Sequence, residues 1–177
     1  LMAELRAQAA FLASNGYHHH VGANTWSSAG APYAPADRAR LTRATILGAD
    51  VILLPEKWNA WLDGPGLRDQ AERLDAGPTV EAMSDWARAH RVNLIGGSIA
   101  ILGDGDRVGN VSIVYDRDGT RTAAYTKIHL FDVDVGGISY RESDGTEPGS
   151  QPVVADIDGV RFGLTVCYDL RFPELYR

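Results

Sequence analysis

The stretch from Val160 to Arg177, VRFGLTVCYDLRFPELYR, constrains the fold more than any other segment of this chain. The apolar run over 160–166 is typical of a strand, a polar turn follows it, and Pro173 suits the first turn of a helix. Cys167, the only cysteine, stands between the strand and the turn. A strand–turn–helix lifts a side chain out of a sheet at its carboxyl end, where open α/β folds place their chemistry. Taken alone, such a cysteine is more often a small buried hydrophobe than a nucleophile.

The composition excludes several classes of protein. The chain has 177 residues, the length of one domain, with a net charge of −6 and a pI near 5.3, which argues against nucleic acid or an anionic membrane as the main partner. One cysteine excludes an internal disulfide and fits a reducing compartment, so a cytoplasmic protein is expected. No apolar run is long enough to span a bilayer, and no signal-peptide pattern is present. The three histidines at 18–20 indicate a loop or the remnant of a tag rather than a metal site.

Hydrophobic patterning and turn signals predict alternating helices and strands. Helices are expected over 2–14, 37–48 and 79–90, and strands over 49–55, 93–102, 108–115, 121–126, 152–157 and 160–166. Thr79 is the expected N-cap of the third helix. Residues 128–150 form a predicted loop, and loops of this length are commonly functional. Asn110, near a strand start, is expected to be a structural hydrogen-bonding residue.

Three reactive side chains follow directly after predicted strands: Glu56, Lys127 and Cys167. In a layered sheet they can gather at one edge. A cysteine attacks as the thiolate, so a carboxylate that takes its proton makes it a better nucleophile. An ammonium group can stabilise both the thiolate and the oxyanion that forms after attack. The three residue types therefore make a complete set for acyl transfer without a histidine.

Three motifs carry a resemblance to a known family: ILLPEKW at 52–58, YTKIHLFDVDV at 125–135 and GLTVCYDLRFPELYR at 163–177. They closely resemble, in the same order, the signature segments of the nitrilase superfamily of carbon–nitrogen hydrolases. With SYRES at 139–143, the chain looks most like the branch of omega-amidases and deaminated-glutathione amidases. The resemblance implies an α/β four-layer α-β-β-α sandwich, incomplete at the C-terminus. It assigns 36–177 to the N-terminal part of the hydrolase domain, after an atypical segment at 1–35.

The resemblance also implies roles for single residues. Cys167 would be the nucleophile, and Glu56 the general base for the thiol and later for water. Lys127 would stabilise the oxyanion together with the backbone N–H of Tyr168. Glu142 matches a second glutamate that lies beside the lysine in this family. A thioester on Cys167 would form as ammonia leaves a small omega-amide, and no cofactor or metal would be required.

Substrates in this branch tend to be small amides whose far end carries a carboxylate. A cationic or hydrogen-bonding pocket would bind that group, and Tyr140, Arg141 and Tyr168 are the candidates for it. Asp169 and Arg171 are expected to tie down the turn after the cysteine through charge-assisted hydrogen bonds. Family members commonly pair through helices near the nucleophile, so a homodimer or higher homo-oligomer is expected.

Two alternatives stay open at this point. Within the same chemistry, the protein could be a carbamoyl-amide hydrolase or a nitrilase relative. From another class, it could be a non-catalytic truncated fragment or assembly module of the same fold. This second alternative comes from the truncation, since the family's domain normally continues beyond Arg177. Two other departures from the family pattern are VGANTW at 21–26, a poor version of its first strand, and the absence of a common proline before Gly136-Gly137.

Overall fold

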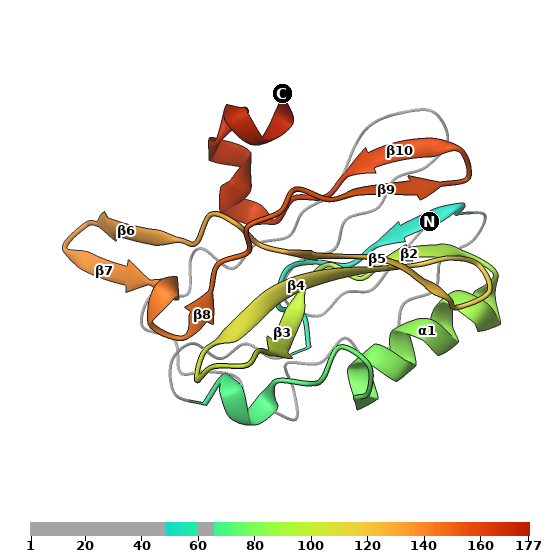
Figure 1. Ribbon diagram of the computed structural model, residues 1–177, viewed down its shortest axis with the longest axis horizontal. Coiled ribbons are helices and arrows are strands. Elements are labelled where there is room, and N and C mark those ends of the chain that lie inside the picture. The colour runs from blue at the N-terminus through green and yellow to red at the C-terminus, as the bar shows by residue number, and fades with distance from the viewer. Residues whose placement is uncertain (1–48, 60–65) are drawn as a thin grey trace.

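Strand β4 (Val108–Tyr115) lies at the centre of the computed structural model, which describes residues 49–59 and 66–177 (Figure 1). Along one edge it pairs antiparallel with β2 (Asn93–Ile95) and β3 (Ile99–Leu102), and along the other with antiparallel β5 (Arg121–Thr126) and parallel β8 (Thr146–Glu147). β1 (Val51–Leu53) extends the sheet by pairing parallel with β2. The predicted bounds of β4 and β5 are confirmed. The segments expected at 1–35 and 37–48, with the histidines at 18–20, lie outside the described residues.

Two apolar layers cover the two faces of this sheet. Helix α1 (Pro78–His90) buries Val80, Met83 and Ala87 against residues of β2, β3 and β4. The hairpin of β9 (Val154–Ile157) and β10 (Val160–Gly163) packs on the other face through a second cluster that includes Tyr125. Figure 1 shows α1 and this hairpin on opposite sides of β4 and β5. The order helix, sheet, second β layer follows the predicted sandwich.

The continuous strand predicted over 93–102 is wrong, because the chain leaves the extended line at Gly96–Ser98 between β2 and β3. Gly97 has a φ of +60° there, and a Cβ on it would collide with the carbonyl oxygens of Leu54 and Pro55. Only glycine allows both this conformation and this approach. An apolar run does not reveal such a break, since the residues on both sides of it are buried.

Residues 128–150 are not the unstructured loop that was predicted. They contain the hairpin of β6 (Asp132–Val135) and β7 (Ile138–Arg141), a 3-10 turn at Glu142–Asp144, and β8. The hairpin projects from the sheet in Figure 1, and its side chains, the apolar ones included, are largely exposed. Its strands, DVDV and ISYR, are only four residues long each, too short for their alternation to predict strands inside a Gly- and charge-containing segment. Cross-strand polar contacts hold it instead, as between Arg141 and Asp134 (2.9 Å).

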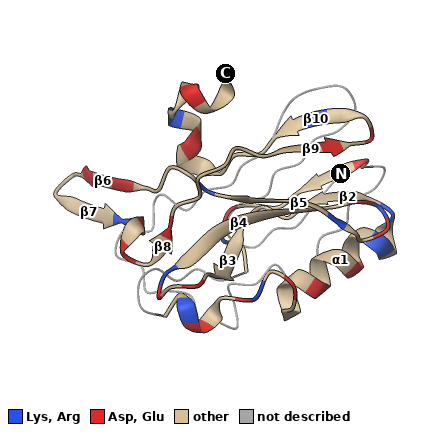
Figure 2. Cartoon of the chain, in the orientation of Figure 1, with Lys and Arg blue, Asp and Glu red and all other residues tan. Residues whose placement is uncertain are grey.

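Helix α1 is capped by a distant carboxylate and not by Thr79 as expected. The helix begins at Pro78, and the Glu72 carboxylate accepts hydrogen bonds from the backbone N–H groups of Thr79 (2.9 Å) and Val80 (3.0 Å). A negative charge at this end also complements the helix dipole. Charged residues of both signs are interspersed along α1 and near the ends of the strands (Figure 2). Within the described residues, no helix is long and apolar enough to cross a membrane.

Replacing Glu72 by Ala should lower the free energy of unfolding by about 1 kcal/mol, because two N–H groups at the helix start lose their acceptor. Urea denaturation followed by circular dichroism measures this loss. Asp106→Ala in the exposed turn after β3 removes a carboxylate that caps no helix, and it should leave the midpoint where it is. Equal midpoints for both variants would contradict the capping role.

Candidate active site

The loop that carries Glu56 is held from behind by the junction between β2 and β3. The backbone N–H of Ser98 donates to the Pro55 carbonyl (3.2 Å), and the Ser98 hydroxyl accepts from the Lys57 N–H (3.2 Å). The indole of Trp58 donates to the Gly96 carbonyl (2.9 Å). Glu56 therefore lies three residues beyond β1, in a turn whose shape is set by hydrogen bonds to residues about 40 positions away.

The alternation of side chains along β5 positions Lys127. Ala124 packs toward α1, whereas Ala123 and Tyr125 pack toward the β9–β10 hairpin. Lys127 follows Tyr125 by two residues and so continues on the hairpin side. Its backbone N–H bonds to the Asn110 carbonyl (2.9 Å), which keeps it in register with β4. The ammonium group is brought to the interior in this way, and the side chain is only 1% exposed.

Two carboxylates share the buried ammonium of Lys127. Its Nζ donates to Oε1 of Glu56 (2.9 Å) and to Oε2 of Glu142 (2.8 Å). Glu142 also accepts from the Phe131 N–H (2.8 Å), and its side chain is 7% exposed against 27% for Glu56. Lys57 adds a second cation 3.4 Å from Glu142. Glu142 thus pairs with Lys127 on the buried side of the cluster, whereas Glu56 is partly accessible to solvent.

The amide of Asn110 bridges the same two glutamates. Its Nδ2 donates to Oε1 of Glu56 (2.8 Å) and to Oε1 of Glu142 (3.0 Å), and the residue is 2% exposed. Asn110 is a hydrogen-bonding residue, as expected, but its partners are site carboxylates. The sequence signal for these partners is the alternation of side chains along β4. Asn110 lies four residues before Val114, so both side chains face the β9–β10 hairpin.

Replacing Asn110 by Ala should cost about 2–3 kcal/mol of stability, because two buried hydrogen bonds to charged groups are lost. Ser112→Ala is the matched control: Ser112 is also buried, two residues along the same strand, and should change stability far less. Chemical denaturation of both variants gives the comparison. Similar losses at the two positions would mean that the amide bridge contributes nothing specific.

The cluster shifts the pKa of its members in opposite directions. Burial lowers the pKa of Lys127, but the charges of Glu56 and Glu142 outweigh it, so the pKa lies above the ordinary lysine value. Burial raises the pKa of Glu142, yet its hydrogen bond and charge contact with Lys127 leave the pKa below the ordinary value. Both groups are therefore charged at neutral pH.

Cys167 opens a 3-10 turn, Cys167–Arg171, four residues after the end of β10. The predicted strand leading directly into the cysteine is wrong, because β10 ends at Gly163. A helical segment does begin at Pro173 as expected, but it is of the 3-10 type and runs from Pro173 to Tyr176. The φ of Cys167 is +48°, a left-handed conformation that costs a non-glycine residue of order 1 kcal/mol and concentrates at functional sites. No local residue pattern indicates this strain.

The thiol of Cys167 is electrostatically coupled to the cluster. The residue as a whole is exposed, but neighbouring protein atoms partly desolvate its thiol. This partial burial, followed by the negative charge of Glu56, raises the thiol pKa to about 11, although Lys127 acts in the opposite direction. A thiol with this pKa is protonated at pH 7. It can attack only if a neighbouring base takes its proton.

The predicted substrate contacts have different surroundings. The rings of Tyr168 and Tyr140 both contact Phe131, with centroids 5.2 and 5.6 Å away. Arg141 is directed to Asp134 of β6 (2.9 Å) and donates to the Tyr140 carbonyl (2.8 Å). Within residues 49–59 and 66–177, no backbone acceptor is found for the N–H of Tyr168.

Of the two residues expected to tie down the turn, Asp169 is fully buried and accepts four hydrogen bonds. Arg171 is exposed and forms no ion pair with any described residue. No group of metal-ligating side chains is present in the described part of the chain.

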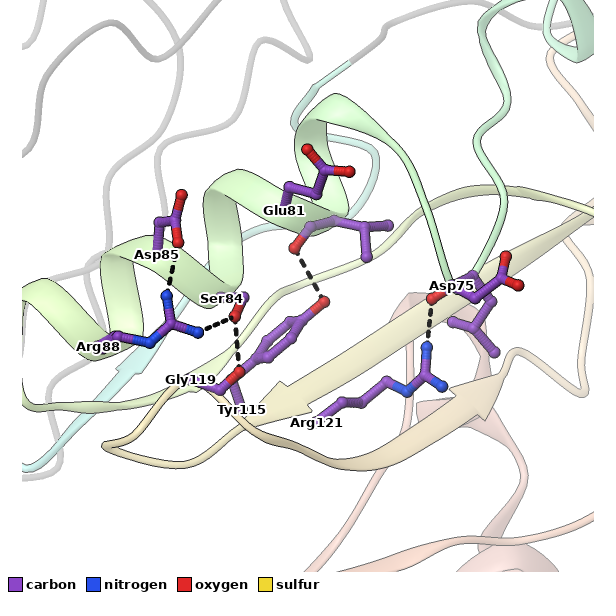
Figure 3. A pocket seen from close by; sticks show the side chains of 10 residues that line it. Asp75, Glu81, Ser84, Asp85, Arg88, Tyr115, Gly119 and Arg121 are labelled. Carbon is purple, nitrogen blue, oxygen red and sulfur yellow. Dashed lines mark hydrogen bonds and ion pairs between the residues drawn. The ribbon is translucent and has the colours of Figure 1, made fainter.

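A separate groove of about 510 Å³ lies between α1 and the turn from β4 to β5 (Figure 3). Both of its arginines already have partners: Arg88 donates to Asp85 and to the Ser84 hydroxyl, and Arg121 donates to the Leu74 carbonyl. None of the predicted site residues lines it. The reactive cluster and this groove are therefore different places on the molecule.

Comparisons with known proteins agree with the motifs. The carbon–nitrogen hydrolase family model matches residues 19–177. The chain is 38% identical over 140 residues to the chloroplastic omega-amidase of Arabidopsis thaliana, covering 76% of this chain and 38% of that protein. It is 37% identical over 134 residues to a deaminated glutathione amidase of Yersinia enterocolitica, covering 73% and 47%. The crystal structure of Saccharomyces cerevisiae Nit3, of branch 10 of the nitrilase superfamily, superposes with a TM-score of 0.62 at 30% identity over 71% of this chain and 45% of that one.

The chain spans less than half the length of each of these relatives. It shares with them the α/β nitrilase fold. By the extent of the family match and the likeness of the fold, this chain belongs to the carbon–nitrogen hydrolases of the nitrilase superfamily.

Proposed function

We propose that this protein hydrolyses the terminal amide of a small omega-amide through a thioester on Cys167. The observation that carries the proposal is the coupling of the thiol to a buried Glu56–Lys127–Glu142 cluster. A protonated thiol, a carboxylate with an open side and a fixed ammonium are the parts that acyl transfer needs.

In the first half-reaction the Cys167 sulfur attacks the amide carbonyl carbon as its proton passes to Glu56. Charge develops on the carbonyl oxygen, which the Lys127 ammonium and the backbone N–H of Tyr168 stabilise. The ammonium has three N–H groups and two of them are bound to Glu56 and Glu142, so the third is available to the oxyanion. The C–N bond breaks, Glu56 protonates the leaving nitrogen, and ammonia departs.

The second half-reaction uses the same groups in reverse. Glu56 takes a proton from water, and the hydroxide attacks the thioester carbon. The tetrahedral oxyanion collapses, the C–S bond breaks, and the proton returns from Glu56 to the Cys167 sulfur. The product is a carboxylic acid. Asn110 and Glu142 hold the acid–base pair in place throughout and exchange no proton.

The preference for an omega-amide rests on likeness to omega-amidases and a deaminated glutathione amidase. Tyr140 and Tyr168, joined through Phe131, are the proposed contacts for the far end of the substrate. Arg141 would have to exchange Asp134 for a substrate carboxylate to take part.

Ammonia release from a panel of small omega-amides, deaminated glutathione included, tests the proposal. The unmodified chain should release ammonia, and added hydroxylamine should divert the product to a hydroxamate, because it intercepts a thioester. Cys167→Ala should reduce release by at least about 10⁴-fold, as removal of a catalytic nucleophile does elsewhere. Since Cys167 is the only thiol, no second cysteine can replace it.

The outcomes separate the alternatives. Release that persists in Cys167→Ala would exclude the thioester. Turnover of N-carbamoyl compounds or nitriles with none of amides would move the reaction to the other classes. No product from any compound would contradict the proposed activity for these 177 residues.

A further inference from the structure

The carboxylate of Asp169, two residues after the proposed nucleophile, has no exposed surface. Its Oδ2 accepts hydrogen bonds from the Tyr125 hydroxyl (2.7 Å) and the Val166 backbone N–H (2.9 Å). Its Oδ1 accepts from the backbone N–H (2.9 Å) and the ring Nδ1 (2.8 Å) of His129. Four donors thus converge on one buried group that exchanges no proton in the proposed reaction.

These donors flank both reactive residues of the site. Tyr125 and His129 stand two positions before and two positions after Lys127. Val166 and Asp169 itself stand one before and two after Cys167. One carboxylate therefore joins the segment that carries the ammonium to the segment that carries the thiol.

A ring contact joins the same two segments. The imidazole of His129 stacks on Phe172 with a centroid distance of 3.7 Å and an interplanar angle of 7°. Tyr168 meets Phe172 edge to face at 5.4 Å. The turn after the cysteine is thus packed against the segment after β5 as well as bonded to it.

The chemistry of this position requires a carboxylate. All of the partners are donors, and an ionised carboxylate is a pure acceptor with room for about four hydrogen bonds. An amide of the same shape would turn an NH₂ group toward an N–H or O–H donor. The left-handed Cys167 also needs an external restraint, since its backbone would relax if the turn were free.

We propose that Asp169 is a positioning residue, which holds the Cys167 thiol in register with the Glu56–Lys127 pair by clamping the two segments together. Its effect on turnover rests on the proposed function. Its effect on the position of the thiol does not, because the reactivity of the thiol can be measured without any substrate.

The test follows the alkylation of Cys167 by iodoacetamide from pH 7 to pH 10.5, beside kcat and KM for amide hydrolysis. In the unmodified chain the rate should still be rising at pH 10, since the thiol pKa is about 11. Asp169→Asn should move the midpoint of the alkylation profile down toward the ordinary cysteine value of about 8.5. The reason is that a displaced thiol lies farther from the charge of Glu56 and from the protein atoms that partly bury it. Its kcat should fall at least about tenfold with KM little changed.

Tyr125→Phe keeps every charge and removes one of the four bonds, so a downward shift in this variant cannot come from loss of the Asp169 charge. It also covers the case in which Asp169→Asn fails to fold. Asp116→Asn is the control: that carboxylate accepts two backbone N–H groups (2.9 Å each) in the turn between β4 and β5, away from the site. Its alkylation profile and kcat should match the unmodified chain.

A downward shift in Tyr125→Phe with an unchanged Asp116→Asn profile supports the clamp, whether or not any amide is hydrolysed. Tyr125→Phe that folds and keeps the original midpoint and kcat would overturn it. Thiol shifts as expected in a chain that releases no ammonia would leave the clamp standing and reject the proposed function.

Discussion

Replacing Glu56 by Gln should make Cys167 react faster with an alkylating reagent while it nearly abolishes amide hydrolysis. The two effects run in opposite directions because Glu56 has two consequences for the thiol. Its negative charge raises the thiol pKa, so its removal should leave more thiolate at a given pH. It is also the proposed proton acceptor, and without it neither half-reaction has a base.

The expected sizes are large enough to measure. Below the pKa, each unit by which the pKa falls raises the thiolate fraction about tenfold, and a modest loss of nucleophilicity offsets part of this. Alkylation of Glu56→Gln at pH 8 should therefore be about tenfold faster. Ammonia release should fall by about 10³-fold or more, since the same group assists both half-reactions.

Glu174→Gln is the matched control, an exposed glutamate beyond the cysteine turn. It should change neither rate. Slower or unchanged alkylation of Glu56→Gln would mean that the Glu56 charge does not hold the thiol proton. Unchanged ammonia release would remove Glu56 from the mechanism.

Replacing Lys127 by Met should cost the most stability of any single change in the site. Met has a similar length but no charge, so Glu142 would remain buried with its main cation gone, and Glu56 would face it without compensation. Breaking a buried ion pair in this way costs about 3–5 kcal/mol. The melting temperature should fall by roughly 10 °C for a chain of this size.

The loss of stability in Lys127→Met should depend on pH. In the unmodified chain the pKa of Glu142 is lowered, so its contribution is present above the ordinary carboxyl value and is lost as the pH falls through the folded pKa. In Lys127→Met burial remains without the lysine, so the pKa of Glu142 should rise above the ordinary value. Protonation of Glu142 in acid then removes the unfavourable buried charge in the variant. The difference in stability between the unmodified chain and Lys127→Met should therefore be largest near pH 7 and shrink toward pH 4.

The double variant Lys127→Met with Glu142→Gln should recover part of the loss at pH 7. Arg73→Met removes a cation from an exposed pair with Asp75 and should hardly change the melting temperature. Thermal denaturation of the variants at pH 7 and pH 4 gives both comparisons. A difference in stability that grows in acid would contradict the assigned charge state of the cluster.

The parts of the fold that the sequence predicted are those in which local pattern and burial agree. β4 and β5 have β-branched residues, bounding turns and two covered faces, and their ends fall where expected. The strand over 93–102 failed because both halves are buried, and only the backbone approach at Gly97 separates them. The β6–β7 hairpin failed for a different reason, since its two strands are only four residues long each and their apolar side chains are exposed.

The site shows the same division. Glu56, Lys127 and Cys167 could be singled out because each is a reactive side chain directly after a predicted strand, although only Lys127 follows its strand without a gap in the structure. Glu142 needed the family motif, because nothing local distinguishes it from an exposed loop carboxylate. The bridge from Asn110 to two glutamates and the four bonds of Asp169 depend on how distant segments pack, and a periodicity argument cannot reach such contacts.

The glycine junction between β2 and β3 bears on any attempt to transplant this chemistry. The turn that carries Glu56 fits against Gly97, which leaves no room for a side chain, and it is held by Gly96 and Ser98. If residues 54–58 alone were grafted onto another sheet, the hydrogen bonds and the close backbone contact that fix the shape of this turn would be lost. The smallest unit that could be transferred is this turn together with residues 96–98, in their present relative positions.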